Sequence, residues 1–244
     1  MLTFKQYLIE AVKEGKNLHL EHLEDEVLNH GVDGTRAAIN FLQSLRDMLA
    51  GNAKKSVNVS VKWDGAPAIF AGINPENDKF FVGTKGVFNV NPKVNYTDAD
   101  IDKNHSAAGL NAKLKVALKH LPKLGITDVL QGDMLFTDDD FKTETIDDKS
   151  YITFTPNTIT YAIPKESSHK ITKAKMGIVW HTTYSGEKLE DMRASFGANI
   201  GGLTKTNDVW FSDANYQDTS GTVNFNKAET TKFTNILSLA GKQF

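Results

Sequence analysis

The chain has 244 residues, enough to bury a substantial core, and its composition of 40% hydrophobic and 24% charged residues is ordinary for a globular protein. It has no cysteine, which excludes disulfides, thiolate zinc sites and cysteine nucleophiles and fits a reducing compartment. The net charge of −2 provides no general attraction for nucleic acid. We find neither an apolar run of about 20 residues nor a secretory signal, so we expect a cytoplasmic protein that does not cross a membrane.

The first 51 residues are predicted to form a helical N-terminal region. Apolar residues recur at helical spacing up to Gly15, again before Gly31, and a third time from Thr35 to Ala50. Glycine often ends helices because it readily adopts the left-handed conformation of a C-terminal cap, and Thr35 is a suitable N-cap. We therefore expect three helices here, followed by a second domain over residues 52–244.

The stretch from Val57 to Phe70 contains the main candidate residues. Valine alternates with polar residues in its first half, which is typical of a strand with one buried face. Lys62 ends this predicted strand, two residues before Asp64. Gly65 follows, and a glycine allows the backbone to approach a ligand closely. We expect an antiparallel hairpin across the loop at Asn74-Pro75-Glu76-Asn77-Asp78, with a first strand that ends near Lys62.

The middle of the chain is predicted to contain strands and one helix. Residues 79–90 read as a strand, residues 91–104 as a polar loop, and residues 106–121 as a helix that Pro122 ends. The strand that follows places Gln131 and Asp133 on one face, because successive side chains of a strand point to opposite sides.

The last third is predicted to begin with a β-hairpin that turns at Pro156-Asn157. A strand then places Ile178 and Trp180 on one side and Val179 and His181 on the other. The expected remaining elements are a short helix at 186–197, a strand after 207 and a C-terminal helix at 228–244.

Three short motifs, in this order, resemble those of the covalent nucleotidyltransferases, the family of ATP-dependent DNA and RNA ligases and mRNA capping enzymes. Lys62-Trp63-Asp64-Gly65 resembles the motif whose lysine amine attacks the α-phosphate of a nucleotide. Thr84-Lys85-Gly86 is similar to a Ser/Thr-Lys-Gly motif of RNA ligases, and Gly132-Asp133 to a Gly-Glu strand, with a shorter acid. The resemblance covers residues 55–184.

The resemblance implies an α+β fold, with an antiparallel-sheet nucleotidyltransferase core and a helical N-terminal extension. It implies an ATP-dependent polynucleotide ligase-like adenylyltransferase, acting on RNA more than on DNA, that forms a lysyl-AMP intermediate with Mg²⁺. The residues implied as catalytic are Lys62 and Asp64, those implied to contact the nucleotide are Gly65, Lys85, Gly86, Asp133 and Trp180, and Asp133 is also the implied metal ligand. Tyr184 is the second choice for the aromatic residue that stacks on the base.

Two late family motifs are missing, a Glu-Gly strand and a Lys-x-Lys that contacts the α-phosphate. We therefore expect either a longer protein or a partner that supplies them. Two alternative functions remain: a GTP-using capping-type transferase, or a non-catalytic nucleotide- or nucleic-acid-binding bacteriophage protein, located in the infected host or in the virion. For each candidate there is also a plain structural alternative: Lys62 in an exposed hairpin, Asp133 at a strand end, and Trp180 in the core.

Nucleic acid would need a local basic patch, and two groups of lysines are candidates. One group consists of Lys113, Lys115, Lys119 and Lys123, and the other of Lys165, Lys170, Lys173 and Lys175. At the N-terminus, Leu8-Ile9-Glu10-Ala11 resembles the cleaved capsid-targeting peptides of large tailed bacteriophages, with an ordinary first helix as the alternative.

Overall fold

The computed structural model describes residues 23–52, 61–215 and 224–243. The chain divides into two compact units, which we call the helical unit and the sheet unit. The helical unit contains the described residues from the two ends of the chain, up to Val61 and from Asn215 onward. The sheet unit runs from Lys62 to Ala214 and therefore contains all of the described candidate residues.

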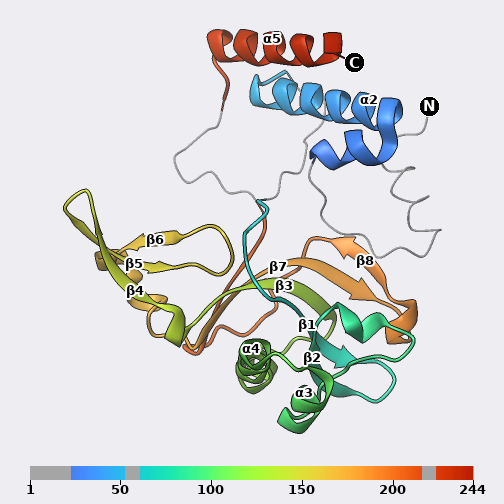
Figure 1. The fold of residues 1–244 in the computed structure, drawn as a ribbon, viewed down its shortest axis with the longest axis vertical. Helices are drawn as coiled ribbons and strands as arrows, with labels where there is room; N and C mark the ends of the chain where they lie inside the picture. The colour runs from blue at the N-terminus through green and yellow to red at the C-terminus, as the bar shows by residue number, and fades with distance from the viewer. Residues whose placement is uncertain (1–22, 53–60, 216–223, 244) are drawn as a thin grey trace. The chain divides into compact units, whose positions relative to one another are not determined.

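Helix α2 (Leu23–Leu49) is interrupted at Gly31, where φ is 53° and ψ is −127°. A side chain rarely adopts this conformation, so a glycine is well suited to the bend. The predicted break at Gly31 is confirmed, and the chain is helical both before and after it (Figure 1). The helix predicted before Gly15, with the resemblance to a targeting peptide, lies outside the described residues.

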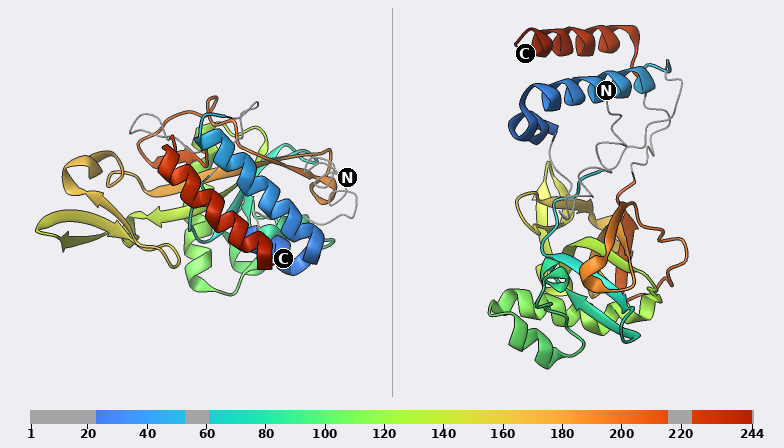
Figure 2. Two further views of the ribbon diagram at one scale, coloured as in Figure 1. Left: turned by 90° about the horizontal axis from the view of Figure 1, so that it is seen from above. Right: turned by 90° about the vertical axis from the view of Figure 1, so that its right-hand side faces the viewer.

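Helix α5 (Lys227–Gln243) lies beside α2 (Figures 1 and 2). The Arg46 guanidinium donates a hydrogen bond to Thr234 Oγ1 at 3.3 Å, and the Phe225 N–H donates one to the Leu49 carbonyl at 2.7 Å. The expected second domain included this C-terminal helix. Instead, α5 packs against α2 and belongs with it to the helical unit.

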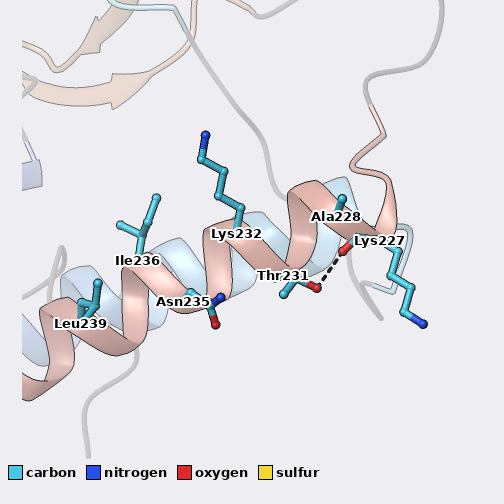
Figure 3. Close-up of a pocket in the computed structure, with 7 residues that line it drawn as sticks. All are labelled: Lys227, Ala228, Thr231, Lys232, Asn235, Ile236 and Leu239. Atoms are coloured by element: carbon cyan, nitrogen blue, oxygen red, sulfur yellow. Dashed lines mark hydrogen bonds between the residues drawn. The ribbon is translucent and has the colours of Figure 1, made fainter.

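One face of α5 remains open and partly apolar (Figure 3). Ile236 and Leu239 on this face are 57% and 61% exposed. The face forms a shallow pocket, and the residues that line it are Lys227, Ala228, Thr231, Lys232, Asn235, Ile236 and Leu239.

None of the helices in the described part of the chain has the length and apolar character that crossing a membrane requires.

The main sheet of the sheet unit has six strands, in the order β2-β1-β3-β7-β8, with β9 paired to β7. All pairs are antiparallel except β7 with β9, which are parallel. The expected α+β class with antiparallel sheets is therefore confirmed. The strands are β1 (Ala68–Asn74), β2 (Lys79–Gly83), β3 (Val129–Thr137), β7 (Met176–Ser185), β8 (Arg193–Phe196) and β9 (Val209–Asp213).

Helix α4 (Ala108–His120) covers one face of this sheet. Its Leu114 and Ala117 have no exposed surface and pack in one core cluster with Met134 and Trp180. Burial of apolar side chains from both layers is the main stabilising contribution here. Because Met134 faces α4, its neighbour Asp133 faces the opposite side of the sheet.

A second sheet has three strands, β4 (Lys142–Ile146), β5 (Lys149–Phe154) and β6 (Tyr161–Pro164). The predicted hairpin across Pro156-Asn157 is confirmed, because β5 and β6 pair antiparallel. Phe154 and Tyr161 of this sheet pack in one apolar cluster with Leu135 and Val179 of the main sheet.

Several local predictions are wrong in part. The hairpin across residues 74–78 is present, but its strands are β1 and β2: residues 61–67, where the first strand was expected to end, form neither helix nor strand, and the second strand ends at Gly83. Residues 57–60 of the expected first strand lie outside the described residues. The expected loop at 91–104 contains helix α3 (Asp98–Asn104), since Thr97 and Asp100 cap it reciprocally. The expected helix at 186–197 is a short 3-10 turn followed by β8, which pairs with β7.

Candidate functional site

Asp133 lies at the centre of the candidate site, on the face of the main sheet that turns away from α4. Across the sheet its backbone pairs with Ala68 of β1 and Val179 of β7. One apolar cluster, which includes Phe70 and Tyr184, covers one end of this face, and the cluster of Leu135 and Val179 covers the other. The carboxylate therefore lies on a polar stretch between two apolar regions.

The segment that carries Lys62 is held against β3 by its backbone. The Ala66 N–H donates to the Met134 carbonyl at 2.9 Å, and the Met134 N–H donates to the Pro67 carbonyl at 3.1 Å. Lys113 of α4 approaches from the other layer, with its Nζ 3.4 Å from the Ala66 carbonyl oxygen. These contacts place the residues just before β1 beside Asp133.

Gly65 is the position of closest approach. A Cβ atom built there would lie 2.6 Å from the Asp133 Cβ and 2.9 Å from the Met134 carbonyl oxygen. Both distances are shorter than carbon and oxygen atoms tolerate, and one of the two partners is backbone. The glycine of the motif is therefore required because of the space between the segment and β3.

Asp64 connects the Lys62 segment to the loop between β5 and β6. Its Oδ1 accepts a hydrogen bond from the Asn157 side chain at 2.8 Å, and its Oδ2 accepts from the backbone N–H groups of Thr158 and Ile159 at 2.7 and 2.6 Å. The Ile159 N–H is the largest cause of a lowered pKa of this carboxyl, and Asn157, Thr158 and the charge of Lys62 lower the pKa further.

Aromatic stacking strengthens the same connection. The Trp63 ring stacks on Tyr161 with centroids 5.5 Å apart, and Tyr161 stacks on Phe154 at 5.3 Å. The Tyr161 hydroxyl accepts a hydrogen bond from the Asp64 backbone N–H at 2.8 Å. The second sheet thus holds the Lys62 segment from one side, while β3 holds it from the other.

The Lys62 side chain is exposed, at the edge of these contacts. Its charge lies close enough to Asp64 to lower the pKa of that carboxyl. Lys62, Asp64, Gly65 and Asp133, which the sequence analysis proposed from separate motifs, are therefore brought into one region.

Lys85 and Gly86 begin a short 3-10 turn, η1 (Lys85–Phe88), directly after β2. Phe88 of this turn packs against Phe70 and stacks on Tyr184 with centroids 4.7 Å apart. Phe70 pairs with Gln131, on the same face of the sheet as Asp133. The turn therefore lies on the same face of the sheet as Asp133, over the apolar cluster of Phe70 and Tyr184. The Lys85 side chain is exposed there.

Trp180 does not lie on this face. Its ring has no exposed surface and packs among Met134, Ile178 and the residues of α4. Tyr184, the second choice, is also buried, and burial raises the pKa of its hydroxyl to about 12. The expected stacking of a nucleotide base on Trp180 thus disagrees with its position, because side chains alternate along β7 and Trp180 is on the core side.

His181 was not a candidate, although it lies beside Asp133. Its Nε2 is 3.7 Å from Asp133 Oδ1, and its Nδ1 is 2.8 Å from the hydroxyl oxygen of Thr182. The sequence contained one signal for it, since His181 and Val179 were expected on the face opposite Trp180. The pairing of Asp133 with Val179, which brings the imidazole beside this carboxylate, is not visible in the sequence.

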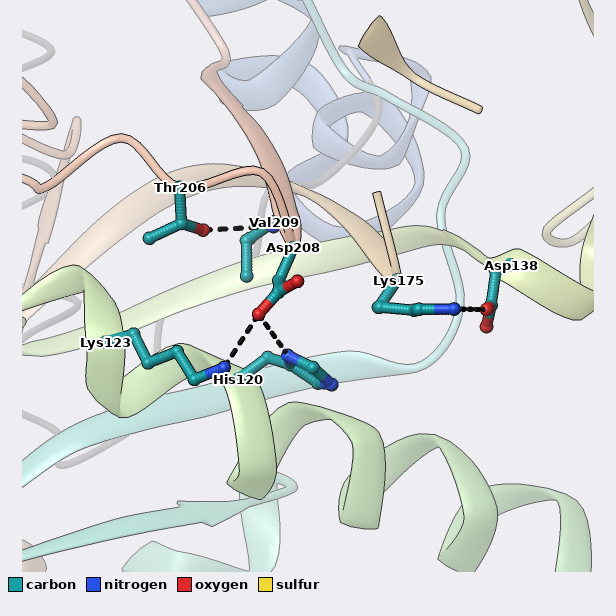
Figure 4. A network of polar contacts seen from close by, with 7 residues as sticks. All are labelled: His120, Lys123, Asp138, Lys175, Thr206, Asp208 and Val209. Atoms are coloured by element: carbon teal, nitrogen blue, oxygen red, sulfur yellow. Dashed lines mark hydrogen bonds and ion pairs between the residues drawn. The ribbon is translucent and has the colours of Figure 1, made fainter. Parts of the chain in front are cut away.

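A separate polar network lies at the end of α4 (Figure 4). The Asp208 carboxylate accepts a hydrogen bond from Lys123 at 2.7 Å and lies 3.3 Å from His120 Nδ1. Burial is the main cause of a lowered pKa of His120, and Asp208 opposes that effect. These contacts join α4 to the segment before β9.

Among the described residues, no group of three or more His, Asp or Glu side chains could hold a metal ion.

Comparison with known proteins identifies the family but not an activity. No curated protein matches this chain, and no solved structure does. One family model matches residues 17–244, which include every described residue of the site. The chain therefore belongs to DUF6267, a family of unknown function.

Proposed function

We propose that the protein is an ATP-dependent, ligase-like adenylyltransferase in which Lys62 carries AMP covalently. The observation that supports this most is the convergence of motifs: the Lys62 segment lies against β3 at Gly65, beside the carboxylate of Asp133. These two motifs are separated in the sequence, yet they lie together at β3; the third motif, with Lys85, lies on the same face against Phe70 and Tyr184. The nucleotidyltransferase fold itself is part of the proposal.

In the proposed reaction the neutral Lys62 amine attacks the α-phosphorus of ATP. A P–N bond forms, the P–O bond to pyrophosphate breaks, and the amine releases a proton to solvent. Asp64 holds the nucleophile segment against the loop of residues 157–159, because both of its oxygens accept hydrogen bonds from that loop. Its role is therefore to position Lys62, and it acts through the backbone.

Asp133 and Lys85 are the proposed contacts of the nucleotide. The Asp133 carboxylate is partly exposed and could accept a hydrogen bond from a ribose hydroxyl or bind a metal ion. Magnesium fits this site only as an ion carried by the phosphates, because magnesium in proteins commonly uses one or two carboxylates and substrate oxygens. It would reduce the negative charge of the phosphates. The exposed Lys85 would approach the nucleotide from η1.

The test is incubation of the protein with ATP labelled at the α-phosphate and with magnesium, followed by denaturation. We expect a covalent label on the wild type, none on Lys62→Ala, and a label on Lys79→Ala, which removes an exposed lysine at the start of β2. A phosphoramidate is labile in acid, so the label should be lost in acid and kept in base. A wild type without label, with and without added polynucleotide, contradicts the proposal.

A second candidate is a non-catalytic nucleotide- or nucleic-acid-binding protein with a ligase-like fold. It is favoured by the buried position of Trp180 and by the use of both Asp64 oxygens within the protein. In that case, calorimetry would detect ATP binding while the labelling assay gives no adduct. Labelled GTP in the same assay separates the third candidate, a capping-type transferase, since only that enzyme would prefer GTP.

Nucleic acid is a proposed partner, and the ion pairs of the two lysine groups support one group over the other as the contact surface. In the α4 group, Lys113, Lys115 and Lys123 each lie within ion-pair distance of a carboxylate. In the other group, Lys175 pairs with Asp138. The proposed contact surface is therefore the exposed set on and after the 3-10 turn η4 (Lys165–Lys170), which consists of Lys165, Lys170 and Lys173.

Charge reversal of this set tests the nucleic-acid proposal. We expect Lys165→Glu with Lys170→Glu to weaken RNA binding and to lower its salt dependence, because each phosphate contact contributes to the slope of affinity against salt. The matched control is Lys115→Glu with Lys119→Glu on α4. Equal losses for both pairs would contradict the choice of surface.

A further inference from the structure

The candidate site contains one histidine that no motif accounts for. His181 lies at an irregularity of β7: Gln131 pairs with Thr182 and Gly132 pairs with Trp180, so that His181 is the extra residue between them. Such a bulge interrupts the regular alternation of side chains, and bulges are frequent beside active sites. His181 keeps the face opposite Trp180, which is the face of Asp133, and the bulge brings Thr182, the partner of Gln131, onto the same face beside it.

The surroundings hold the backbone of this bulge on both sides. The Gly197 N–H donates to the His181 carbonyl at 2.7 Å, and the Ala214 N–H donates to the Trp180 carbonyl at 3.0 Å. A Cβ atom at Gly132 would lie 2.6 Å from the Val179 carbonyl oxygen, which shows how closely β3 and β7 approach there. Hydrogen bonds from Gly197 and Ala214 and the close approach of β3 therefore hold the backbone of the bulge in place.

The side chains form a short series from the core to the carboxylate. The Thr182 hydroxyl is 2.8 Å from His181 Nδ1, and His181 Nε2 is 3.7 Å from Asp133 Oδ1. Exposure increases along this series, since Thr182 is 2% exposed and the side chains of His181 and Asp133 are 10% and 23% exposed. Because the carboxylate accepts hydrogen bonds, the nitrogen that faces it should be the one that carries the proton.

We propose that His181 is a positioning residue for Asp133. The Thr182 hydroxyl donates to Nδ1 and so favours the tautomer with the proton on Nε2, which then donates to Asp133 Oδ1. At 3.7 Å the contact is too long for a hydrogen bond, and a shift of less than 1 Å on ligand binding would complete it. Oδ2 of Asp133 is then left to the ligand, a ribose hydroxyl of the nucleotide.

The role given to Asp133 rests on the proposed function, but the arrangement of the three side chains does not. Nitrogen NMR of the imidazole at pH about 8.5, where an ordinary imidazole is neutral, tests the arrangement without any nucleotide. We expect Nε2 to be protonated in the wild type, Thr182→Val to give a mixture of tautomers, and Thr182→Ser to restore the wild-type spectrum. A proton on Nδ1 in the wild type overturns the proposal, whatever the protein catalyses.

The rate of covalent labelling tests the role. His181→Leu should lower it by about 10- to 100-fold, the usual cost of losing a residue that orients a functional side chain. His181→Gln should recover most of the rate, because its amide nitrogen reaches the place of Nε2, whereas His181→Asn reaches only the place of Nδ1. His169→Leu is the control, since His169 is an exposed histidine on η4.

A double variant separates positioning from a general loss of structure. If His181 acts through Asp133, then His181→Leu should cost little in an Asp133→Asn background, because the two changes remove one interaction. Additive losses, or a failure of His181→Gln to recover the rate, contradict the proposal. A wild type that gives no label, but shows the expected tautomer, contradicts the proposed function and leaves the arrangement supported.

Discussion

Gly65→Ala tests the close approach of the Lys62 segment to Asp133. The added methyl group would lie 2.6 Å from the Asp133 Cβ and 2.9 Å from the Met134 carbonyl oxygen. Gly65 does not have a positive φ, so the expected cost comes from these contacts. Insertion of a methyl group into a packed place costs about 1–3 kcal/mol. For a protein of this size that corresponds to a decrease in Tm of about 2–12 °C.

The assay is thermal unfolding followed by circular dichroism, together with the labelling rate. Gly109→Ala is a matched control, because Gly109 is in α4 and a Cβ atom there would meet nothing within 4 Å. The control should keep or increase stability, since alanine favours a helix by up to about 1 kcal/mol relative to glycine. We expect the labelling rate to fall in Gly65→Ala even at temperatures where the variant is folded. If Gly65→Ala is as stable and as active as the control, the close approach is wrong.

Three further predictions concern other residues. Trp180→Ala should destabilise the sheet unit by about 3–5 kcal/mol, as truncation of a buried aromatic does. The milder Trp180→Phe should leave unchanged the ATP concentration at which labelling is half-maximal. A large increase in that concentration would indicate that the ring contacts the base. Because hydrogen bonds lower the pKa of folded Asp64, its contribution to stability is present above the ordinary pKa of about 3.9 and is lost as the pH falls through the lowered value. The difference in unfolding free energy between wild type and Asp64→Asn, measured by urea titration, should therefore decrease on acidification below pH 4; a difference that does not change with pH would contradict this role of the Asp64 hydrogen bonds. Gly31→Ala should destabilise the helical unit by about 1–3 kcal/mol, because its φ of 53° is unfavourable for a side chain, and an unchanged urea midpoint would show that the bend needs no glycine.

The elements with a clear period were predictable from the sequence. The strand of Asp133, the strand of Trp180, the hairpin across Pro156-Asn157 and the C-terminal helix are all present, because the side-chain period reflects burial on one face. The sides of β7 were also predicted correctly, with Trp180 opposite His181. The preference for Trp180 as a ligand contact came from the resemblance, and its burial in the core disagrees with that preference.

The errors lie where local composition is ambiguous. The polar run that includes Asp98–Asn104 forms a helix through a cap between Thr97 and Asp100, and its apolar side is provided by Ile101 alone. Residues 193–196 form a strand because β7 offers an edge with which they can pair, which overrides their local helical pattern.

The amino-acid sequence alone determined which residues are candidates for chemistry, because Lys62, Asp64, Lys85 and Asp133 stand in motifs whose order and spacing are visible along the chain. Only the tertiary structure decided how they are arranged. It places Gly65 against Asp133, uses the Asp64 carboxylate to hold residues 157–159, and brings His181 beside Asp133. The physical reason is that such contacts join residues far apart in the chain, and they depend on strand register and on the space between layers, which no local pattern encodes.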